Sequence, residues 1–237
     1  MPNPSFLGTA LPLIQAPMAG VQGHALAAAV CNAGGLGSIP AAMLSLDALH
    51  NELTQLTALT DKPYNVNFFC HTPPALDATR EAVWQQALQP YYEELGLSLA
   101  DIVPGPGRAP FSEAVADVVG PFKPAVVSFH FGLPSAVLLA RVKSWGSLVL
   151  ASATTVEEAL WLQEHGADAI IAQGLEAGGH RGIFLSDDLN TQVGTMALLP
   201  QIVQAVTVPV IAAGGIADAA GVAAAMVLGA SAVQIGT

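Results

Sequence analysis

The chain has 237 residues, a length that suits one large α/β domain, and neither a Ser/Pro/Gly-rich linker nor a run of charges divides it. It carries 7 Lys and Arg against 18 Asp and Glu, and the resulting net charge of -11 argues against a nucleic-acid partner, which would need clustered cations. Hydrophobic residues make up 52% and charged residues only 11%, so we expect helices packed against a large buried sheet.

Cysteine usage and the two ends of the chain indicate a cytoplasmic protein. Cys31 and Cys70 form no CxxC pair, which suits free thiols in a reducing compartment. Residues 1–5 lack the basic and apolar regions of a signal peptide. Residues 208–237 are strongly apolar, but Pro209 and four glycines cut them into pieces too short to span a bilayer, so no membrane association is expected.

Short apolar segments alternate with helical patterns along the whole chain. Strands are predicted over residues 11–16, 35–39, 64–69, 125–129, 148–151, 169–172, 208–212 and 232–235. Helices are predicted over residues 23–32, 45–60, 75–95, 111–119, 134–143, 155–165, 196–206 and 217–228, with Ser45 and Thr155 as N-caps. The two glycines of the second strand suggest that a ligand or a neighbouring backbone comes close there.

The spacing of these segments predicts the fold class. Most strands follow one another after about 20 to 25 residues, the rhythm of βα units in a parallel sheet. Eight such units predict an α/β fold of the (β/α)8 TIM-barrel type, and an open doubly wound sheet is the alternative because one sequence does not reveal strand order. Residues 75–119, with a Pro/Gly-rich loop near 104–110, are interpreted as an elaborated crossover that contains two of these helices. The helix that would follow the eighth predicted strand is missing.

A glycine-rich loop follows the sixth predicted strand and carries one imidazole. His180 is the only side chain in this loop that titrates near neutrality, so it is the candidate for moving a proton. A glycine-rich surface loop with a solvated histidine is the competing interpretation. The backbone can approach a ligand closely at the four glycines of the loop, Gly174, Gly178, Gly179 and Gly182.

Polar residues recur where the predicted strands end. In a barrel these ends share one rim, so His71, His130 and His180 should converge there together with Asn67 and Gln173. A metal site is an alternative explanation for three histidines. No HxH pair or acidic cluster completes a ligand set, so we expect no metal.

A fourth histidine has a structural explanation. His165 is expected on the last turn of its helix beside Gly166, where the helix dipole stabilises it.

Glycines also end the last two predicted strands. Gly214 and Gly215, with Gly236 and Thr237, would form an anion-binding concavity where barrels hold a phosphate, although glycine after a strand is often only a turn. A phosphorylated ligand at a barrel mouth without a metal suggests FMN, which would carry the redox chemistry itself.

Four ordered motifs resemble those of class I nitronate monooxygenases, formerly called 2-nitropropane dioxygenases. They are LPLIQAPMAG at 11–20, NVNFFCH at 65–71, SFHFG at 128–132 and QGLEAGGHRGIF at 173–184. AAGGI at 212–216 and QIGT at 234–237 follow them, so the resemblance extends over the chain.

The resemblance implies roles for single residues. His180 matches the catalytic histidine of that family, and His130 would line the substrate cavity. The Met18 backbone would lie near the isoalloxazine. The remaining contacts to FMN would come from Asn67, Gln173, Gly178, Gly215, Gln234, Ile235, Gly236 and Thr237.

The resemblance also implies a reaction. FMN-dependent oxidation of an alkyl nitronate, with propionate 3-nitronate as the expected substrate, would consume O2 and yield a carbonyl compound and nitrite. An FMN-dependent NADH:quinone or enoyl reductase of the same fold and a non-catalytic flavin-binding remnant are the alternatives. Family members continue beyond strand eight with further helices, so residues 1–237 are interpreted as a single FMN-binding barrel domain that is incomplete at its C-terminal end.

Overall fold

The computed structural model describes residues 6–101 and 108–236 and divides into two compact units. The first unit comprises residues 1–71 and 109–237, and the second comprises residues 72–108. The expectations for residues 1–5, for residues 104–107 of the predicted loop and for Thr237 lie outside the described residues.

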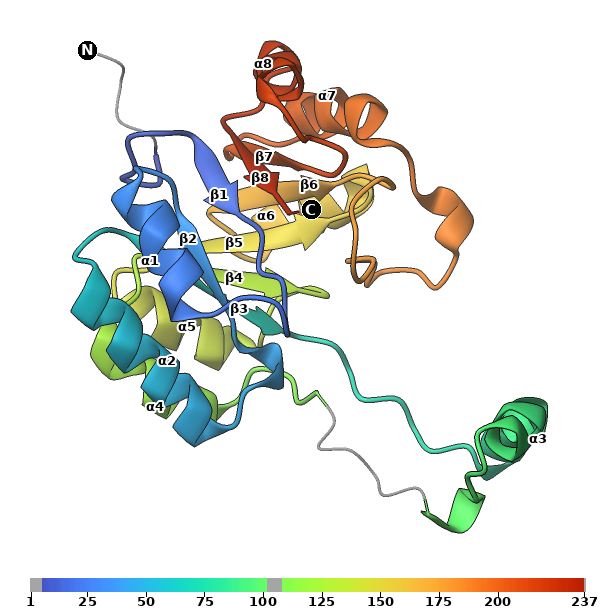
Figure 1. Cartoon of the computed structure of the whole chain (residues 1–237). Helices are drawn as coiled ribbons and strands as arrows, with labels where there is room; N and C mark the ends of the chain where they lie inside the picture. The colour runs from blue at the N-terminus through green and yellow to red at the C-terminus, as the bar shows by residue number, and fades with distance from the viewer. Residues whose placement is uncertain (1–5, 102–107, 237) are drawn as a thin grey trace. The chain divides into compact units, whose positions relative to one another are not determined.

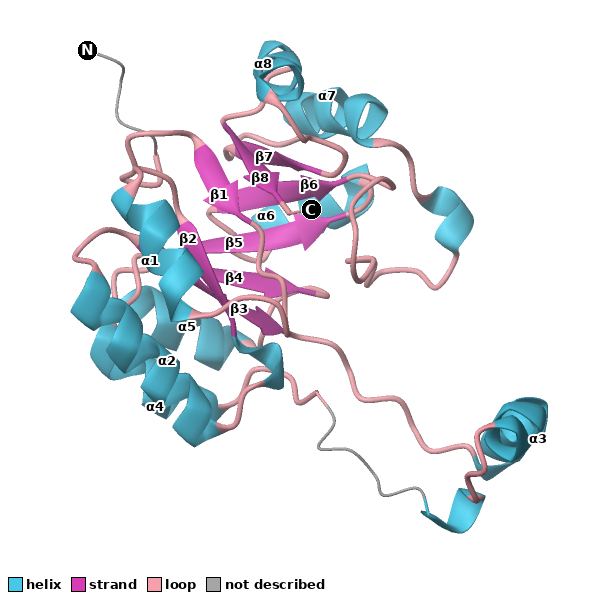
Figure 2. Cartoon of the chain, in the orientation of Figure 1, coloured by secondary structure: helices cyan, strands magenta, loops and turns pink. Residues whose placement is uncertain are grey.

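Eight parallel strands of the first unit form a nearly closed barrel (Figures 1 and 2). They run in the order β1-β8-β7-β6-β5-β4-β3-β2, and β1 meets β2 through a bridge between Ile14 and Leu36. This order confirms the predicted TIM barrel over the open sheet. The strands are β1 (Leu13–Gln15), β2 (Gly37–Pro40), β3 (Tyr64–Phe69), β4 (Val126–His130), β5 (Leu148–Ala153), β6 (Ala169–Gln173), β7 (Val210–Ala213) and β8 (Ala232–Ile235).

Helices connect successive strands, as the sequence predicts, with ends that differ by a few residues. They are α1 (His24–Asn32), α2 (Leu46–Leu59), α3 (Ala78–Glu94), α4 (Glu113–Val119), α5 (Ala136–Ser144), α6 (Val156–Glu164), α7 (Thr195–Ala205) and α8 (Ala219–Val227). Short 3-10 turns are η1 (Ala41–Met43), η2 (Leu99–Asp101), η3 (Gly120–Phe122) and η4 (Leu189–Thr191). Within the described ranges, no helix is long and apolar enough to cross a bilayer.

The predicted caps occupy the expected positions. The Ser45 hydroxyl accepts from the Ala48 N–H at 3.2 Å and begins α2, and Thr155 begins α6 in the same way. His165 ends α6 with its ring stacked on Trp161 at a centroid distance of 3.9 Å, and Gly166 follows with φ +101. His165 therefore lies where expected, at the end of its helix and beside Gly166.

The second unit contains α3 and η2 and buries no side chain of α3. Asp77 caps α3 by accepting from the Thr79 and Arg80 N–H groups, and the helix continues through Pro90. Trp84 and other large apolar side chains are exposed, so this helix has no hydrophobic core of its own.

The interior of the barrel changes from apolar to polar along the strands. Near the amino ends, the inward-facing side chains form an apolar cluster that includes Ile14, Val126 and Leu150. Two further apolar clusters fill the space between the strands and the surrounding helices. Asn65 of β3, in register with Val126 of β4, is a polar exception within the amino-end layer. Towards the carboxyl ends, the same inward-facing rows continue mostly as polar side chains, which gather at that end. These polar residues are Asn67, Ser128, His130, Ser152, Gln173 and Gln234.

Close backbone approach explains Gly37 at the start of β2. A Cβ atom at this position would lie 2.1 Å from the backbone oxygen of Ala27 in α1. A neighbouring backbone, one of the two explanations expected from the sequence, therefore accounts for this glycine.

We expect Gly37→Ala to destabilise the fold by more than about 2 kcal/mol, because α1 must move away from the sheet to admit the methyl group. Urea unfolding followed by circular dichroism measures the change. The matched control is Gly221→Ala in α8, where the new Cβ meets its nearest neighbour at 3.4 Å and should be neutral or slightly stabilising. Equal stability of the two variants would contradict the packing argument.

Candidate active site

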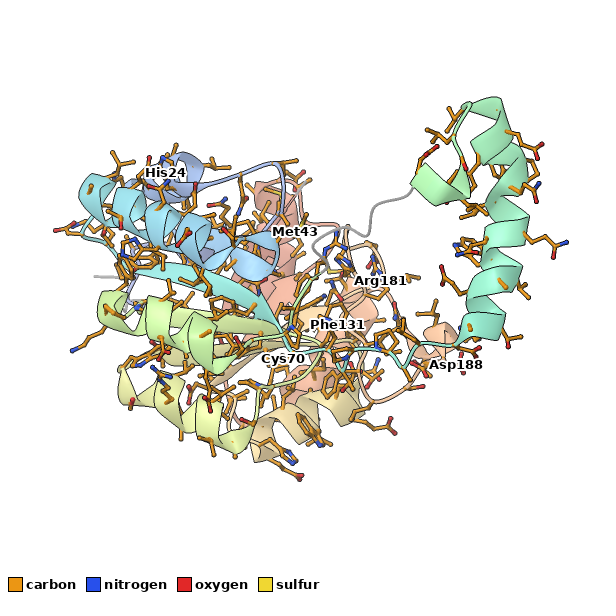
Figure 3. All side chains as sticks on the ribbon, turned by 90° about the horizontal axis from the view of Figure 1, so that it is seen from below. His24, Met43, Cys70, Phe131, Arg181 and Asp188 are labelled. Atoms are coloured by element: carbon orange, nitrogen blue, oxygen red, sulfur yellow. The ribbon has the colours of Figure 1, made fainter. Side chains whose placement is uncertain are left out.

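Three histidines and two phenylalanines cluster where β3, β4 and β6 end. The ring of Phe69 lies 5.9 Å from His130 and 5.3 Å from His180, measured between centroids. Phe131 lies 4.5 Å from His130 and 5.9 Å from His180, and Figure 3 labels it in this region. His71 lies 6.2 Å from both phenylalanine rings. The three histidines expected at one rim therefore do lie together.

No group of three or more His, Cys, Asp or Glu residues in the described part of the chain is arranged to hold a metal ion. The rings of the three histidines instead pack against those of Phe69 and Phe131.

The backbone of the His180 loop is held from inside the barrel. Gln173, the last residue of β6, donates its amide N–H to the His180 carbonyl at 2.9 Å and accepts the Gly182 N–H at 2.6 Å. His130 Nε2 lies 3.2 Å from the same carbonyl. Gly182 must lack a side chain, because a Cβ there would lie 2.8 Å from His130 Cε1. The loop is therefore ordered by side chains of β4 and β6.

These contacts define which nitrogen of the His130 ring carries a hydrogen and whether the ring is charged. A carbonyl oxygen only accepts hydrogen bonds, so His130 Nε2 carries the hydrogen. Burial lowers the pKa of His130 to about 4; the hydrogen bond to the His180 carbonyl opposes this, and the charges of His180 and Arg181 add to it. At neutral pH the His130 ring is thus neutral, with Nδ1 left as an acceptor.

The His180 side chain is exposed, and its ring contacts Phe69 and Phe131 without forming a hydrogen bond. Its ring nitrogens have no hydrogen-bond partner among residues 6–101 and 108–236, although its backbone is fixed. An imidazole held in place by its main chain but free at both nitrogens can accept or donate a proton to a ligand.

Three polar side chains of the barrel interior, Asn65, Asn67 and Gln234, keep acceptor oxygens without a hydrogen bond in the described residues. Asn67 donates its amide to the Ser128 hydroxyl at 3.0 Å and to the Ser128 carbonyl at 3.2 Å, while its own oxygen has no partner in the described residues. Gln234 in β8 has a buried Oε1 without a hydrogen bond. A buried acceptor without a partner is costly, so Gln234 Oε1 fits a ligand that offers an N–H or O–H group.

Glycines lie beside these groups at the ends of β7 and β8. Gly214 and Gly215 have φ values of +122 and +68, which favour glycine. There is also little space for a side chain here, because a Cβ at Gly215 would lie 3.1 Å from Glu176 Cβ. Gly236 is exposed, and a Cβ there would lie 3.9 Å from Met18 Sδ, which brings the ends of β1 and β8 together. Gly178 is exposed in the β6–α7 loop.

Sequence reasoning missed the residues that hold the first half of this loop. Arg181 donates to the carbonyls of Gly174 and Leu175 at 3.0 and 2.8 Å. Glu176 accepts from the Thr195 N–H at 2.7 Å and thereby caps α7. Partial burial acts to raise the pKa of Glu176, but hydrogen bonds from Thr195 and its own N–H, with the charge of Arg181, hold it below its usual value. Arg181 and Glu176 both lie inside the motif at 173–184, but the sequence does not show which groups they bind.

Sequence reasoning also missed Glu158 in the first turn of α6, although the pattern Thr155-x-x-Glu158 of a capping box could have drawn attention to it. Its carboxylate accepts from the backbone of the loop that follows His180.

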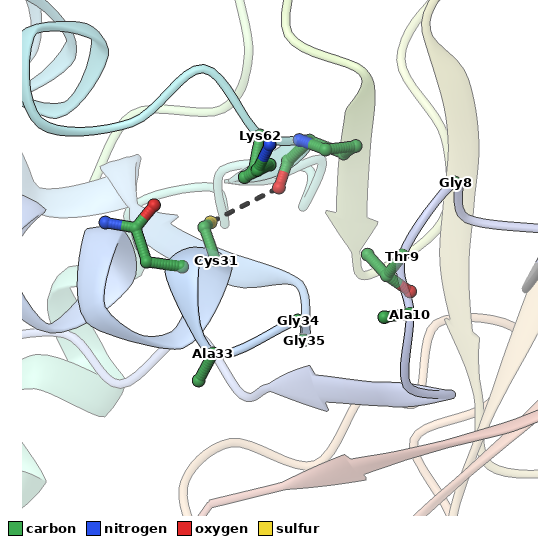
Figure 4. A pocket seen from close by; sticks show the side chains of 10 residues that line it. Gly8, Thr9, Ala10, Cys31, Ala33, Gly34, Gly35 and Lys62 are labelled. Carbon is green, nitrogen blue, oxygen red and sulfur yellow. Dashed lines mark hydrogen bonds between the residues drawn. The ribbon is translucent and has the colours of Figure 1, made fainter.

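The described residues also line a cavity at the other end of the barrel, shown in Figure 4. It has a volume of about 450 Å³ and is lined by segments that precede β1, β2 and β3, including Gly8, Gly34 and Lys62. Cys31 in its wall donates to the Pro63 carbonyl at 3.2 Å, and burial raises the pKa of this thiol. This cavity is therefore separate from the histidine cluster, and burial disfavours the thiolate form of Cys31 in its wall.

Burial holds the folded-state pKa of His130 below its ordinary value of 6.5. The free energy of unfolding therefore has its full value, as far as His130 is concerned, above pH 6.5. It decreases as the pH falls towards 4, because protonation of His130 then favours the unfolded chain. We expect a loss of at most about 2 kcal/mol between pH 7 and pH 5. His130→Gln, whose amide can still donate to the His180 carbonyl, should lack this part of the pH dependence. Urea unfolding at both pH values tests it, with His50→Gln on an exposed site as control. Identical pH dependence of wild type and His130→Gln would contradict the prediction.

Comparison with known proteins supports one family assignment. A family model described as nitronate monooxygenase matches residues 3–237. The nitronate monooxygenases of Paraburkholderia phytofirmans and Pseudomonas aeruginosa are 49% and 44% identical to this chain over 236 residues. Those matches cover 98% of this chain but 64% and 66% of the relatives, so the chain spans slightly less than two thirds of their length.

Solved structures agree with this result. The nitroalkane oxidase from Streptomyces ansochromogenes is 40% identical, with a TM-score of 0.86 over 96% of this chain and 65% of that one. FabK from Thermotoga maritima is 31% identical, with a TM-score of 0.71 over 97% of this chain and 59% of that one. The chain belongs to the nitronate monooxygenase family.

Proposed function

We propose that this barrel carries the active site of a flavin-dependent enzyme that oxidises alkyl nitronates with O2 to a carbonyl compound and nitrite. The observation that carries the proposal is the His180 imidazole, fixed through its backbone carbonyl and free at both ring nitrogens among the described residues. The names of its relatives, nitronate monooxygenase and nitroalkane oxidase, point to two substrates that differ by one proton. The free ring nitrogens of His180 at the mouth can accept or donate that proton.

FMN is the proposed cofactor, consistent with a family of flavoproteins. When bound, it would supply the electron acceptor that no side chain of the site provides. The unpartnered Gln234 Oε1 and the free Asn67 oxygen suit the N–H and hydroxyl groups of a flavin. Gln173 already uses its amide on the His180 loop, so we assign it to holding that loop beside the cofactor. The other proposed contacts are Met18, Gly178, Gly214, Gly215, Ile235, Gly236 and Thr237.

The charges of the loop suit an anionic substrate. The net charge of the chain is -11, yet Arg181 follows His180 directly, and its positive charge adds to the burial that lowers the pKa of His130 and to the hydrogen bonds from Thr195 that lower the pKa of Glu176. A nitronate would therefore meet local positive charge together with the neutral ring of His130. Propionate 3-nitronate is the proposed physiological substrate. Free thiols at Cys31 and Cys70 favour a reducing compartment such as the cytosol.

His180 has a different task for each substrate. A nitronate is already deprotonated at the α-carbon, so its oxidation needs no base. A neutral nitroalkane must first lose its α-proton, which we assign to His180.

We expect His180→Asn to lower turnover of a neutral nitroalkane by about 10² to 10⁴-fold, and turnover of the matching nitronate by less than about tenfold. Oxygen uptake and nitrite release measure both rates, and the visible spectrum reports whether the flavin is bound. His50→Asn, on the exposed face of α2, is the matched control.

Other outcomes would contradict these assignments. Equal losses on both substrates would remove the base role from His180. Rapid flavin reduction by NADH would favour a reductase of the same fold, and colourless protein that takes up no FMN would favour a non-catalytic remnant.

A further inference from the structure

Glu158 is a fully buried carboxylate whose partners are hydrogen-bond donors only. It is 1% exposed, in the first turn of α6. Its Oε2 accepts from the Thr154 N–H at 2.7 Å and the Thr154 hydroxyl at 2.8 Å. Its Oε1 accepts from the N–H groups of Phe184 at 2.7 Å and Leu185 at 3.2 Å. Within the described ranges, no Lys, Arg or His nitrogen forms an ion pair with it.

These four hydrogen bonds join the end of β5 to the loop that carries His180. Thr154 directly follows β5, whereas Phe184 and Leu185 lie between β6 and α7. The Phe184 ring also packs on Trp161 of α6 at a centroid distance of 5.3 Å. The element that bears Glu158 therefore anchors this part of the loop through both its backbone and a side chain.

The opposite part of the same segment has its own anchor. Gln173 and His130 hold the carbonyl of His180, and Gln173 also holds the N–H of Gly182. The segment from 180 to 185, here called the His180 segment, is thus fixed from inside the barrel at its start and by Glu158 at its end.

We propose that Glu158 is a positioning residue, whose buried carboxylate fixes the end of the His180 segment and so keeps the His180 imidazole oriented towards the ligand. This inference rests on the proposed function, in which His180 takes the α-proton. Glu158 makes no contact with the His180 ring and acts through the backbone of Phe184 and Leu185.

The four hydrogen bonds at position 158 require a carboxylate rather than an amide. A glutamine offers one acceptor oxygen, so its NH₂ group would face either the Thr154 N–H or the N–H groups of Phe184 and Leu185. Buried N–H groups left facing a donor are unfavourable, and the segment should detach there. Glu157, the preceding residue, is exposed and provides the matched control.

The test compares E158Q with E157Q and wild type by amide hydrogen exchange in the full chain. We expect the Phe184 and Leu185 amides of E158Q to exchange at least about tenfold faster, while amides of β3 keep their rates and E157Q behaves as wild type. This readout needs no activity. Unchanged exchange at 184 and 185 in E158Q would overturn the proposal.

Kinetics provide a second readout that a general loss of stability would not reproduce. E158Q should lower kcat on a neutral nitroalkane about tenfold and leave kcat on the nitronate within about twofold, because only the nitroalkane needs an oriented base. Equal losses on both substrates would overturn the positioning role. If wild type turns over neither substrate, the proposed function fails, and exchange alone then decides whether Glu158 anchors the segment.

E158D keeps the proposal testable if E158Q does not fold. Its carboxylate is retained but drawn back by one methylene, so the amides at 184 and 185 should exchange at rates above wild type. Wild-type exchange in E158D would overturn the proposal.

Discussion

The backbone carbonyl of His180 is the point on which the site depends, because two side chains of the barrel interior converge on it. Gln173 and His130 both donate to this oxygen, and Gln173 closes a second hydrogen bond to Gly182. A loop with so many glycines would otherwise be entropically expensive to order. By holding the main chain, the barrel leaves the imidazole of His180 without any hydrogen bond of its own in the described structure.

This arrangement is possible because the residues that stabilise the barrel and the residues that face a ligand lie at opposite ends of its interior. Apart from Asn65, apolar side chains fill the amino end of the interior, and polar ones predominate at the carboxyl end. A neutral His130 suits such a position, since its charged form would be poorly solvated among Phe69 and Phe131. Buried polar groups on rigid strands can then orient a mobile loop more firmly than the loop could orient itself.

The sequence predicted the elements of the barrel well, because each strand and helix has a local signal. The third strand was predicted over 64–69 and is observed as Tyr64–Phe69, and Ser45 and Thr155 cap helices as expected. Local signals did not reveal that residues 72–108 form a second compact unit. Helical periodicity identifies a helix, but it does not say against which surface the helix packs.

The residues of the candidate site were predictable from the sequence, but the hydrogen bonds between them were not. Strand ends and a glycine-rich loop identified His130, Gln173 and His180, because parallel strands deliver their carboxyl ends to one rim. The contacts of His130 with the His180 backbone and of Glu158 with Phe184 and Leu185 join residues far apart in sequence. The pairing of Gln173 with the His180 backbone and the low pKa of His130 likewise depend on the folded loop and barrel. The sequence alone thus determined which groups are available. Tertiary structure decided which of them hold the loop and which remain free to react, because burial and hydrogen bonding depend on neighbours that only the closed barrel brings together.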